Sequence, residues 1–261
     1  MSETLELYQY VMGVSSGLLV GFSLGLFGGG GSILAVPLLV STVGAGNAHH
    51  VIGTSAVAVA ANSLAGVVGH ARRGTIKWRC AAVFGTAGMF GAALGSAIGK
   101  AVNGRDLLLL FAGLMFVVAA NMFRHRHRDG EAGATCTLTN MPKVLSFGAG
   151  TGLCSGFFGI GGGFLIVPGL MTSTGMPMIN AISTSLVIIT VMGLTTAISY
   201  ALSGLVLWSL ALAFVLGGSA GVAGGAAAAH LLSRYTGKLK VLFALMLLAS
   251  SVWLGVQSAS L

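Results

Sequence analysis

The sequence reads GLFGGGGSILAVP at residues 25–37 and GFFGIGGGFLIVP at residues 156–168. Each stretch places a run of glycines and a proline inside an otherwise apolar segment. Within a membrane, irregular backbone of this kind survives only where it is buried in protein or lines a water-filled cavity. Paired interruptions at matching places in two halves of a chain are typical of a transporter's substrate site.

The composition is that of a multi-pass membrane protein. The chain of 261 residues is 55% hydrophobic and 7% charged. Several uncharged stretches reach the roughly 20 residues that a helix needs to cross a bilayer. Because Glu3 and Glu6 make the N-terminus acidic, a cleaved signal peptide is not expected. The predicted location is the inner (plasma) membrane. The cysteines, Cys80, Cys136 and Cys154, are too few and too scattered to predict a disulfide or metal framework.

The similarity between the two halves extends beyond the glycines. Residues 53–57 correspond to residues 183–187, and residues 70–78 to residues 200–208. The offset is 131 residues at the glycine runs and 130 after them. This pattern predicts a duplicated chain, with an N-terminal membrane repeat at 1–125, a basic cytoplasmic linker at 126–140 and a C-terminal membrane repeat at 141–261.

Each half is expected to form the same series of helices, and the fold class is an all-α membrane protein. A first helix ends at the glycines, a short helix follows, and three long helices complete the half. The expected ranges are 5–27, 32–43, 48–71, 77–100 and 105–123 in the first half, and 142–157, 163–173, 177–202, 206–232 and 238–257 in the second.

The positive charges predict how these helices are oriented. If the two halves have the same orientation, the basic residues divide eight to five between the two sides of the membrane, which is a poor bias. If the second half is inverted, only Lys100 and Arg105 of the 13 basic residues lie outside, as the positive-inside rule expects. We therefore predict two inverted-topology repeats, each with a broken or re-entrant helical hairpin, and both termini outside. Charge counts do not separate a re-entrant hairpin from two true crossings.

The acidic residues are informative because they are few. They are Glu3, Glu6, Asp106, Asp129 and Glu131, and all are expected at the terminus or in loops. Carboxylates inside a membrane mark cation sites and proton relays. Their absence from the predicted spans disfavours sodium or metal-cation transport and leaves anions or neutral polar solutes as cargo. No metal, cofactor or nucleic-acid partner is predicted.

The glycine runs suit an anion. A helix N-terminus presents free N–H groups that bind anions without a formal charge, and glycine permits close approach. Glycine-rich runs also serve helix packing, and Ser or Thr also bonds its own helix carbonyls. The candidate substrate-binding residues are Gly28, Gly29, Gly30, Gly31, Ser32, Thr54, Ser55, Asn62, Gly159, Gly161, Gly162, Gly163, Thr184 and Ser185.

Other features have structural interpretations. His70 precedes Arg72 and Arg73 and is expected at the membrane interface rather than in a site. Cys154 is expected to behave as a small apolar residue. The spaced glycines at 91–99 and 217–225 predict close helix contacts, within the fold or at the seam of a homodimer.

The paired runs Gly28–Pro37 and Gly159–Pro168, each followed by Thr-Ser, resemble the sulfite exporter TauE/SafE family over nearly the whole chain. That resemblance implies an integral membrane permease of duplicated halves that moves sulfur-containing anions such as sulfite, organosulfonates or thiosulfate-like species.

The prediction is therefore a secondary transporter, not an enzyme, that exports a small sulfur-containing anion by alternating access around the paired breaks. Two alternatives stay open. One is a passive anion channel, which flux against a gradient would exclude. The other is a membrane-embedded enzyme or assembly factor, which the absence of a carboxylate–His or Cys–His constellation disfavours.

Overall fold

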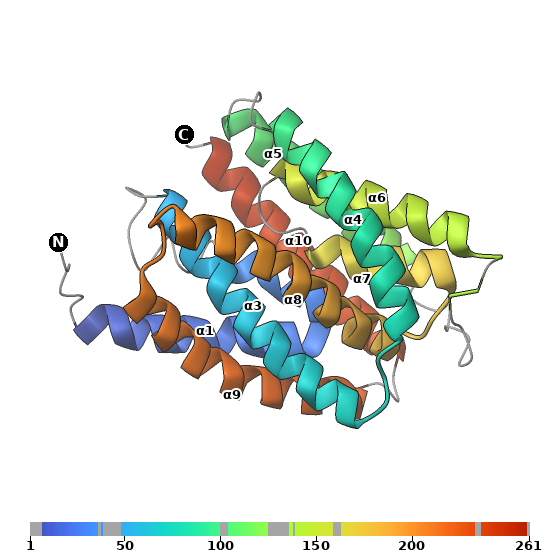
Figure 1. Cartoon of the computed structure of the whole chain (residues 1–261), viewed down its shortest axis with the longest axis horizontal. Coiled ribbons are helices and arrows are strands. Elements are labelled where there is room, and N and C mark those ends of the chain that lie inside the picture. Colours follow the sequence, from blue (N-terminus) through green and yellow to red (C-terminus); the bar gives the residue numbers. More distant parts are fainter. Residues whose placement is uncertain are drawn as a thin grey trace.

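The computed structural model describes residues 7–35, 38, 48–99, 104–124, 136–137, 139–158, 163–232 and 236–259. Within these residues the protein is helical and contains no strand (Figure 1). The first half contributes α1 (Leu7–Phe27), the short 3-10 helix η1 (Gly28–Leu34), α3 (Ala48–Arg72), α4 (Trp78–Gly99) and α5 (Gly104–Arg124). The second half contributes α6 (Met141–Phe158), α7 (Gly163–Thr174), α8 (Met178–Leu202), α9 (Trp208–Leu232) and α10 (Thr236–Ala259).

The predicted helix boundaries are confirmed to within about two residues, with one exception. In the first half a helix was expected over 32–43, after the glycines. Instead η1 begins at Gly28 and includes the glycines themselves, while most of 32–43 lies outside the described residues. The second half has the expected short helix, α7.

The turns that end α3 and α8 follow the repeat. Gly74 and Gly204 have φ of 66° and 70°, a left-handed conformation that glycine adopts without strain. The N–H of Gly74 donates to the carbonyl of Ala71, and the N–H of Gly204 donates to that of Ala201, each over 3.0 Å. Each turn therefore satisfies carbonyl groups that the helix end leaves free.

Two tight helix pairs join the halves to one another. In the first, Gly17, Gly21 and Gly25 of α1 lie against Phe214, Gly218 and Val222 of α9. Residue numbers rise together along this seam, so the two helices are parallel, and they lie side by side in Figure 1.

The second pair joins α4 and α6 by equivalent residues. Gly152 of α6 lies against Gly88 of α4, as Gly21 lies against Gly218. These helices are also parallel, because Gly95 of α4 contacts Leu153 and Phe157 further along α6. The spaced glycines predicted to make close helix contacts do so in both pairs, between helices of different halves.

The corresponding helices α3 and α8 pack on each other in opposite directions. Gly53 contacts Leu205 beyond the end of α8, Gly193 contacts Ala60, and Gly66 contacts Leu186 near the start of α8. Helices α5 and α10 form the remaining pair, in which the Ser251 hydroxyl donates to the Ala112 carbonyl over 2.9 Å.

The surface confirms a multi-pass membrane protein. Four helices in the described part of the chain are long and apolar enough to cross a membrane, namely α1, α3, α8 and α9. Large apolar side chains lie on the outer surface, for example Phe90 with 76% and Leu202 with 85% of its area exposed. Because lipid tails solvate such side chains, the exposed belt is expected of a bilayer protein.

Two sequence predictions are wrong. Cys80 at the start of α4 and Cys136 before α6 form a disulfide, with Cα atoms 5.3 Å apart, although their spacing of 56 residues gave no sign of pairing. Helix packing brings the start of α4 close to the segment before α6, and the spacing of the cysteines in the sequence does not show this. Asp106, expected in a loop, lies within α5.

Candidate functional site

The two glycine runs meet inside the protein. Helix α1 ends at Phe27, and the chain turns into η1 at Gly28, whose φ is 63°. The backbone of Gly29 lies directly against the carbonyl of Gly163, the first residue of α7, so that a Cβ atom at residue 29 would collide with it. The junction of η1 and α7 therefore requires glycine because two backbones occupy the space of one side chain.

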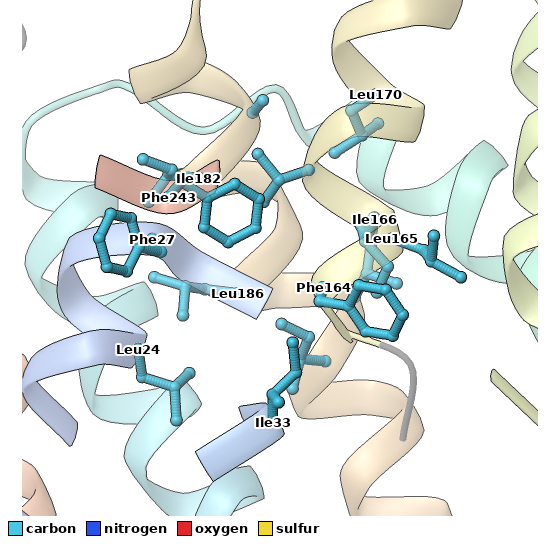
Figure 2. Close-up of a cluster of buried hydrophobic side chains, with 14 of the residues drawn as sticks. Leu24, Phe27, Ile33, Phe164, Leu165, Ile166, Leu170, Ile182, Leu186 and Phe243 are labelled. Carbon is cyan, nitrogen blue, oxygen red and sulfur yellow. The ribbon is translucent and has the colours of Figure 1, made fainter. Parts of the chain in front are cut away.

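An apolar shell encloses this junction. Figure 2 shows Phe27 and Ile33 from the first half, Phe164 from α7, and Ile182 and Leu186 from α8 gathered around it. All five side chains are buried, and the rings of Phe27 and Phe243 lie 5.3 Å apart. In such surroundings a polar ligand would depend on the few polar groups present, because hydrogen bonds are stronger at low dielectric.

Ser185 supplies one of those polar groups. Its hydroxyl accepts a hydrogen bond from the N–H of Gly29 over 3.2 Å and donates to the Ile182 carbonyl over 2.8 Å. A Cβ atom at Gly28 would also collide with this hydroxyl. Ser185 is fully buried, so it joins α8 to the tip of the first-half hairpin.

Thr54 and Thr184 hold the loops of the opposite halves. The Thr54 hydroxyl accepts the N–H of Leu207, just before α9, and the Thr184 hydroxyl accepts the N–H of Lys77, just before α4, each over 3.1 Å. Both side chains are fully buried. Each threonine therefore satisfies a main-chain donor near the start of a helix, a contact that sequence spacing did not indicate.

Asn62 is a buried amide of α3 whose nitrogen and oxygen have no hydrogen-bond partner within the described structure. It lies against Gly218 of α9, where a side chain would collide with it. At the equivalent place in the other half, Met192 lies against Gly88. Because the repeat accepts methionine here, packing alone does not require the amide.

The remaining candidates are placed less fully. Ser55 is buried on α3. Gly30, Gly31 and Ser32 belong to η1, but only their backbone is described. Gly159, Gly161 and Gly162 lie outside the described residues.

The structure shows the surroundings of His70. The residue was expected at the membrane interface, and its side chain is buried, with 1% of its area exposed. Its Nδ1 atom lies 2.9 Å from the Ser183 hydroxyl and 3.3 Å from that of Thr75. Sequence reasoning did not select Ser183, although its counterpart in the other half is Gly53, and a hydroxyl in place of glycine was the available signal.

The helices around the junction carry no acidic side chain. The sequence places no Asp or Glu on α1, α3, α7, α8 or α9. Among the described residues, no group of three or more His, Cys, Asp or Glu could hold a metal ion. The polar contacts at the junction come from the Ser185 hydroxyl and from main-chain groups.

Comparison with known proteins identifies the family, since the sulfite exporter TauE/SafE family profile matches residues 14–254. The chain belongs to the sulfite exporter TauE/SafE family. A probable membrane transporter protein of Xylella fastidiosa (strain Temecula1) is 45% identical over 95% of this chain and 96% of its own length. The probable membrane transporter protein YunE of Bacillus subtilis is 28% identical over 80% of this chain and 84% of its own.

A probable membrane transporter protein of Haemophilus influenzae is 28% identical over 72% of each chain. No solved structure matches the chain. Family membership and these relatives establish a membrane transporter.

Proposed function

We propose that this TauE/SafE family protein exports a small sulfur-containing anion, such as sulfite or an organosulfonate, through the junction of the two glycine runs. The observation that carries the proposal is the contact of Gly29 with Gly163, braced by the Ser185 hydroxyl on the Gly29 N–H. The first turn of α7 begins at this junction, and helix N-termini favour oxyanions. Separation of the two backbones would admit the anion, and their contact would close the path.

The proposed mechanism is alternating access by two inverted repeats. It is supported by the helix directions, because the equivalent helices α3 and α8 run antiparallel, as a pseudo-two-fold axis in the membrane plane would make them. Parallel pairing of α1 with α9 and of α6 with α4 follows from the same symmetry. Motion of one half then opens one hairpin tip as it closes the other.

The proposed orientation places Met1 and Leu261 outside and the residues 124–143 in the cytoplasm. Eleven of the 13 basic residues then lie inside. Cysteine-accessibility labelling in intact cells tests this orientation, and a cytoplasmic C-terminus would contradict it.

The disulfide gives an independent test of the same orientation. In the reducing cytoplasm, Cys80 and Cys136 would be free thiols in cells and would pair only on oxidation of the isolated protein. Rapid acid quenching followed by thiol alkylation measures this, and a bond intact in cells would place that side outside.

Transport itself is tested with purified protein in phosphatidylcholine liposomes loaded with sulfite. We expect flux without sodium, since the cargo can be held by N–H and hydroxyl donors and no carboxylate lies on the helices at the junction. Replacement of sodium by choline should leave the flux unchanged, and an opposing sulfite gradient should be overcome when a pH gradient drives it. Flux that only follows the sulfite gradient would indicate a channel, and flux of none of sulfite, sulfate and organosulfonates would refute the proposal.

A further inference from the structure

We propose that His70, Arg73 and His230 form an oxyanion-binding site at the end of α3, which the cargo occupies before it reaches the glycine junction. This inference rests on the proposed function and adds a second place at which the same cargo is held. None of these three residues belongs to the junction.

The three basic residues converge through helix geometry. Arg73 lies in the turn directly after α3, and its N–H donates to the His70 carbonyl over 3.2 Å. The Arg73 guanidinium donates to the Ala226 carbonyl of α9 over 3.5 Å. His230 follows Ala226 by one helical turn, on the same face of α9.

The His70 ring is held in place and leaves one nitrogen unused. Its Nδ1 atom is 2.9 Å from the Ser183 hydroxyl and accepts that hydroxyl's proton in the tautomer that carries its own proton on Nε2. Its Nε2 atom is buried and has no hydrogen-bond partner in the described part of the protein. A buried polar atom without a partner is costly, and a bound anion would remove that cost by accepting a hydrogen bond from Nε2–H.

Nothing in the sequence of the surrounding helices neutralises this cluster. Helices α3, α8 and α9 contain no Asp or Glu, so the basic groups are brought together without a carboxylate on those helices. Arg73 carries the fixed charge of the cluster, and an anion from solution would pair with it. Arg73 and His230 are exposed, which gives such an anion access, whereas His70 is buried and would receive it at the inner end.

The site is connected to the glycine junction by three consecutive residues of α8. Ser183 contacts His70, Thr184 binds the Lys77 N–H, and Ser185 binds the Gly29 N–H. An anion at His70 would therefore lie within about one helical turn of the serine that braces the first glycine run. The position suits a loading site for the proposed cargo.

The test uses sulfite flux in phosphatidylcholine liposomes, comparing Arg73→Gln, His70→Tyr and the matched control Arg72→Gln. Tyrosine is the residue at the equivalent position 200, and Arg72→Gln removes the same charge from the neighbouring, exposed position. We expect Arg73→Gln and His70→Tyr to raise the half-saturating sulfite concentration about tenfold, the cost of one hydrogen bond to a charged group. The maximal flux should stay the same, and Arg72→Gln should behave as the wild type.

Three outcomes would overturn the loading site. Equal effects of all three variants would indicate a general electrostatic field, and unchanged half-saturation in Arg73→Gln would remove the site even if His70→Tyr failed to fold. If Arg73→Gln lost bound phosphatidylglycerol but kept its sulfite affinity, the occupant would be a lipid phosphate. In each case wild-type sulfite flux would persist, whereas its absence would refute the proposed function instead.

Discussion

Helices α3 and α8 each contact the loop of the opposite half through equivalent residues. Only the contact made by α8 includes a basic side chain, that of His70. Thr54 binds the Leu207 N–H as Thr184 binds the Lys77 N–H. At the preceding position, however, Gly53 packs against Tyr200 and Leu205, whereas Ser183 bonds His70 and Thr75. The repeat therefore keeps the contacts that hold the backbone and varies the groups that can meet a solute.

The same division holds deeper in the protein. Gly21 against Gly218 repeats as Gly152 against Gly88, with backbone in direct contact at both places. Beside these seams, Asn62 replaces Met192. Changes at the repeated backbone contacts should harm both halves alike, whereas changes at the polar differences should act on transport more than on stability.

The largest effect is expected where the halves touch at their glycine runs. Gly29→Val would force a β-branched side chain into the Gly163 carbonyl, and neither backbone can move without distorting a helix end. Overpacking of this kind should cost about 3 kcal/mol or more. For a chain of this size that corresponds to a fall in Tm of roughly 10 °C, with loss of sulfite flux.

The control for this change is Gly69→Ala on α3, where a Cβ atom meets nothing within 4 Å. It should keep or slightly raise the Tm, because alanine favours helix more than glycine does. Normal stability and flux in Gly29→Val would show that the two runs do not touch in the functional protein.

These contacts also show what the sequence could and could not predict. The helices were predictable because apolar spans, glycine interruptions and the repeat itself mark their ends. Other contacts join segments that are distant in the sequence. They are the Cys80–Cys136 disulfide, the burial of His70 and the hydrogen bond from the Leu207 N–H to the Thr54 hydroxyl. Their approach is decided by helix packing, which periodicity does not encode. Within the candidate site, the glycine runs could be selected from the sequence because they recur in both halves, whereas the bond from Gly29 to Ser185 could not be predicted.

A smaller loss of stability, equal at both places, is expected at the α1–α9 and α4–α6 helix contacts. Gly21→Ala and Gly152→Ala each place a Cβ atom against a carbonyl, of Gly218 and Gly88 respectively. Both variants should lose about 2 kcal/mol of stability, measured as equal falls in Tm. Gly150→Ala on the open side of α6 is the matched control and should not lose stability. Unequal falls in Tm would show that the two helix pairs are not packed equally tightly.

Smaller still is the loss expected at the paired threonines. Thr54→Val and Thr184→Val keep the shape of the side chain but leave the N–H of Leu207 or Lys77 without its acceptor. Each should cost about 1 kcal/mol, the order of a hydrogen bond lost near a helix start. The two variants should also slow flux equally if the hydroxyls serve only the backbone. A loss of sulfite affinity in one variant alone, at equal Tm, would assign that hydroxyl to the cargo.

The smallest change in stability is expected at Asn62. Asn62→Met introduces the residue of the other half at a place where the repeat already packs methionine on glycine, so the fold should accept it. Removal of a buried amide whose two polar atoms have no partner in the described structure should raise stability, by up to about 1 kcal/mol. If the amide binds the cargo, sulfite flux should fall although the Tm rises, because the groups that remain cannot replace its N–H donors. The reciprocal change, Met192→Asn, is the matched control: it should lower the Tm by placing an amide at a partly buried apolar position, and it should not improve sulfite affinity. Thermal unfolding and flux measured on the same liposome preparations decide the matter, and a Tm gain with unchanged flux would leave Asn62 as a tolerated polar residue with no part in transport.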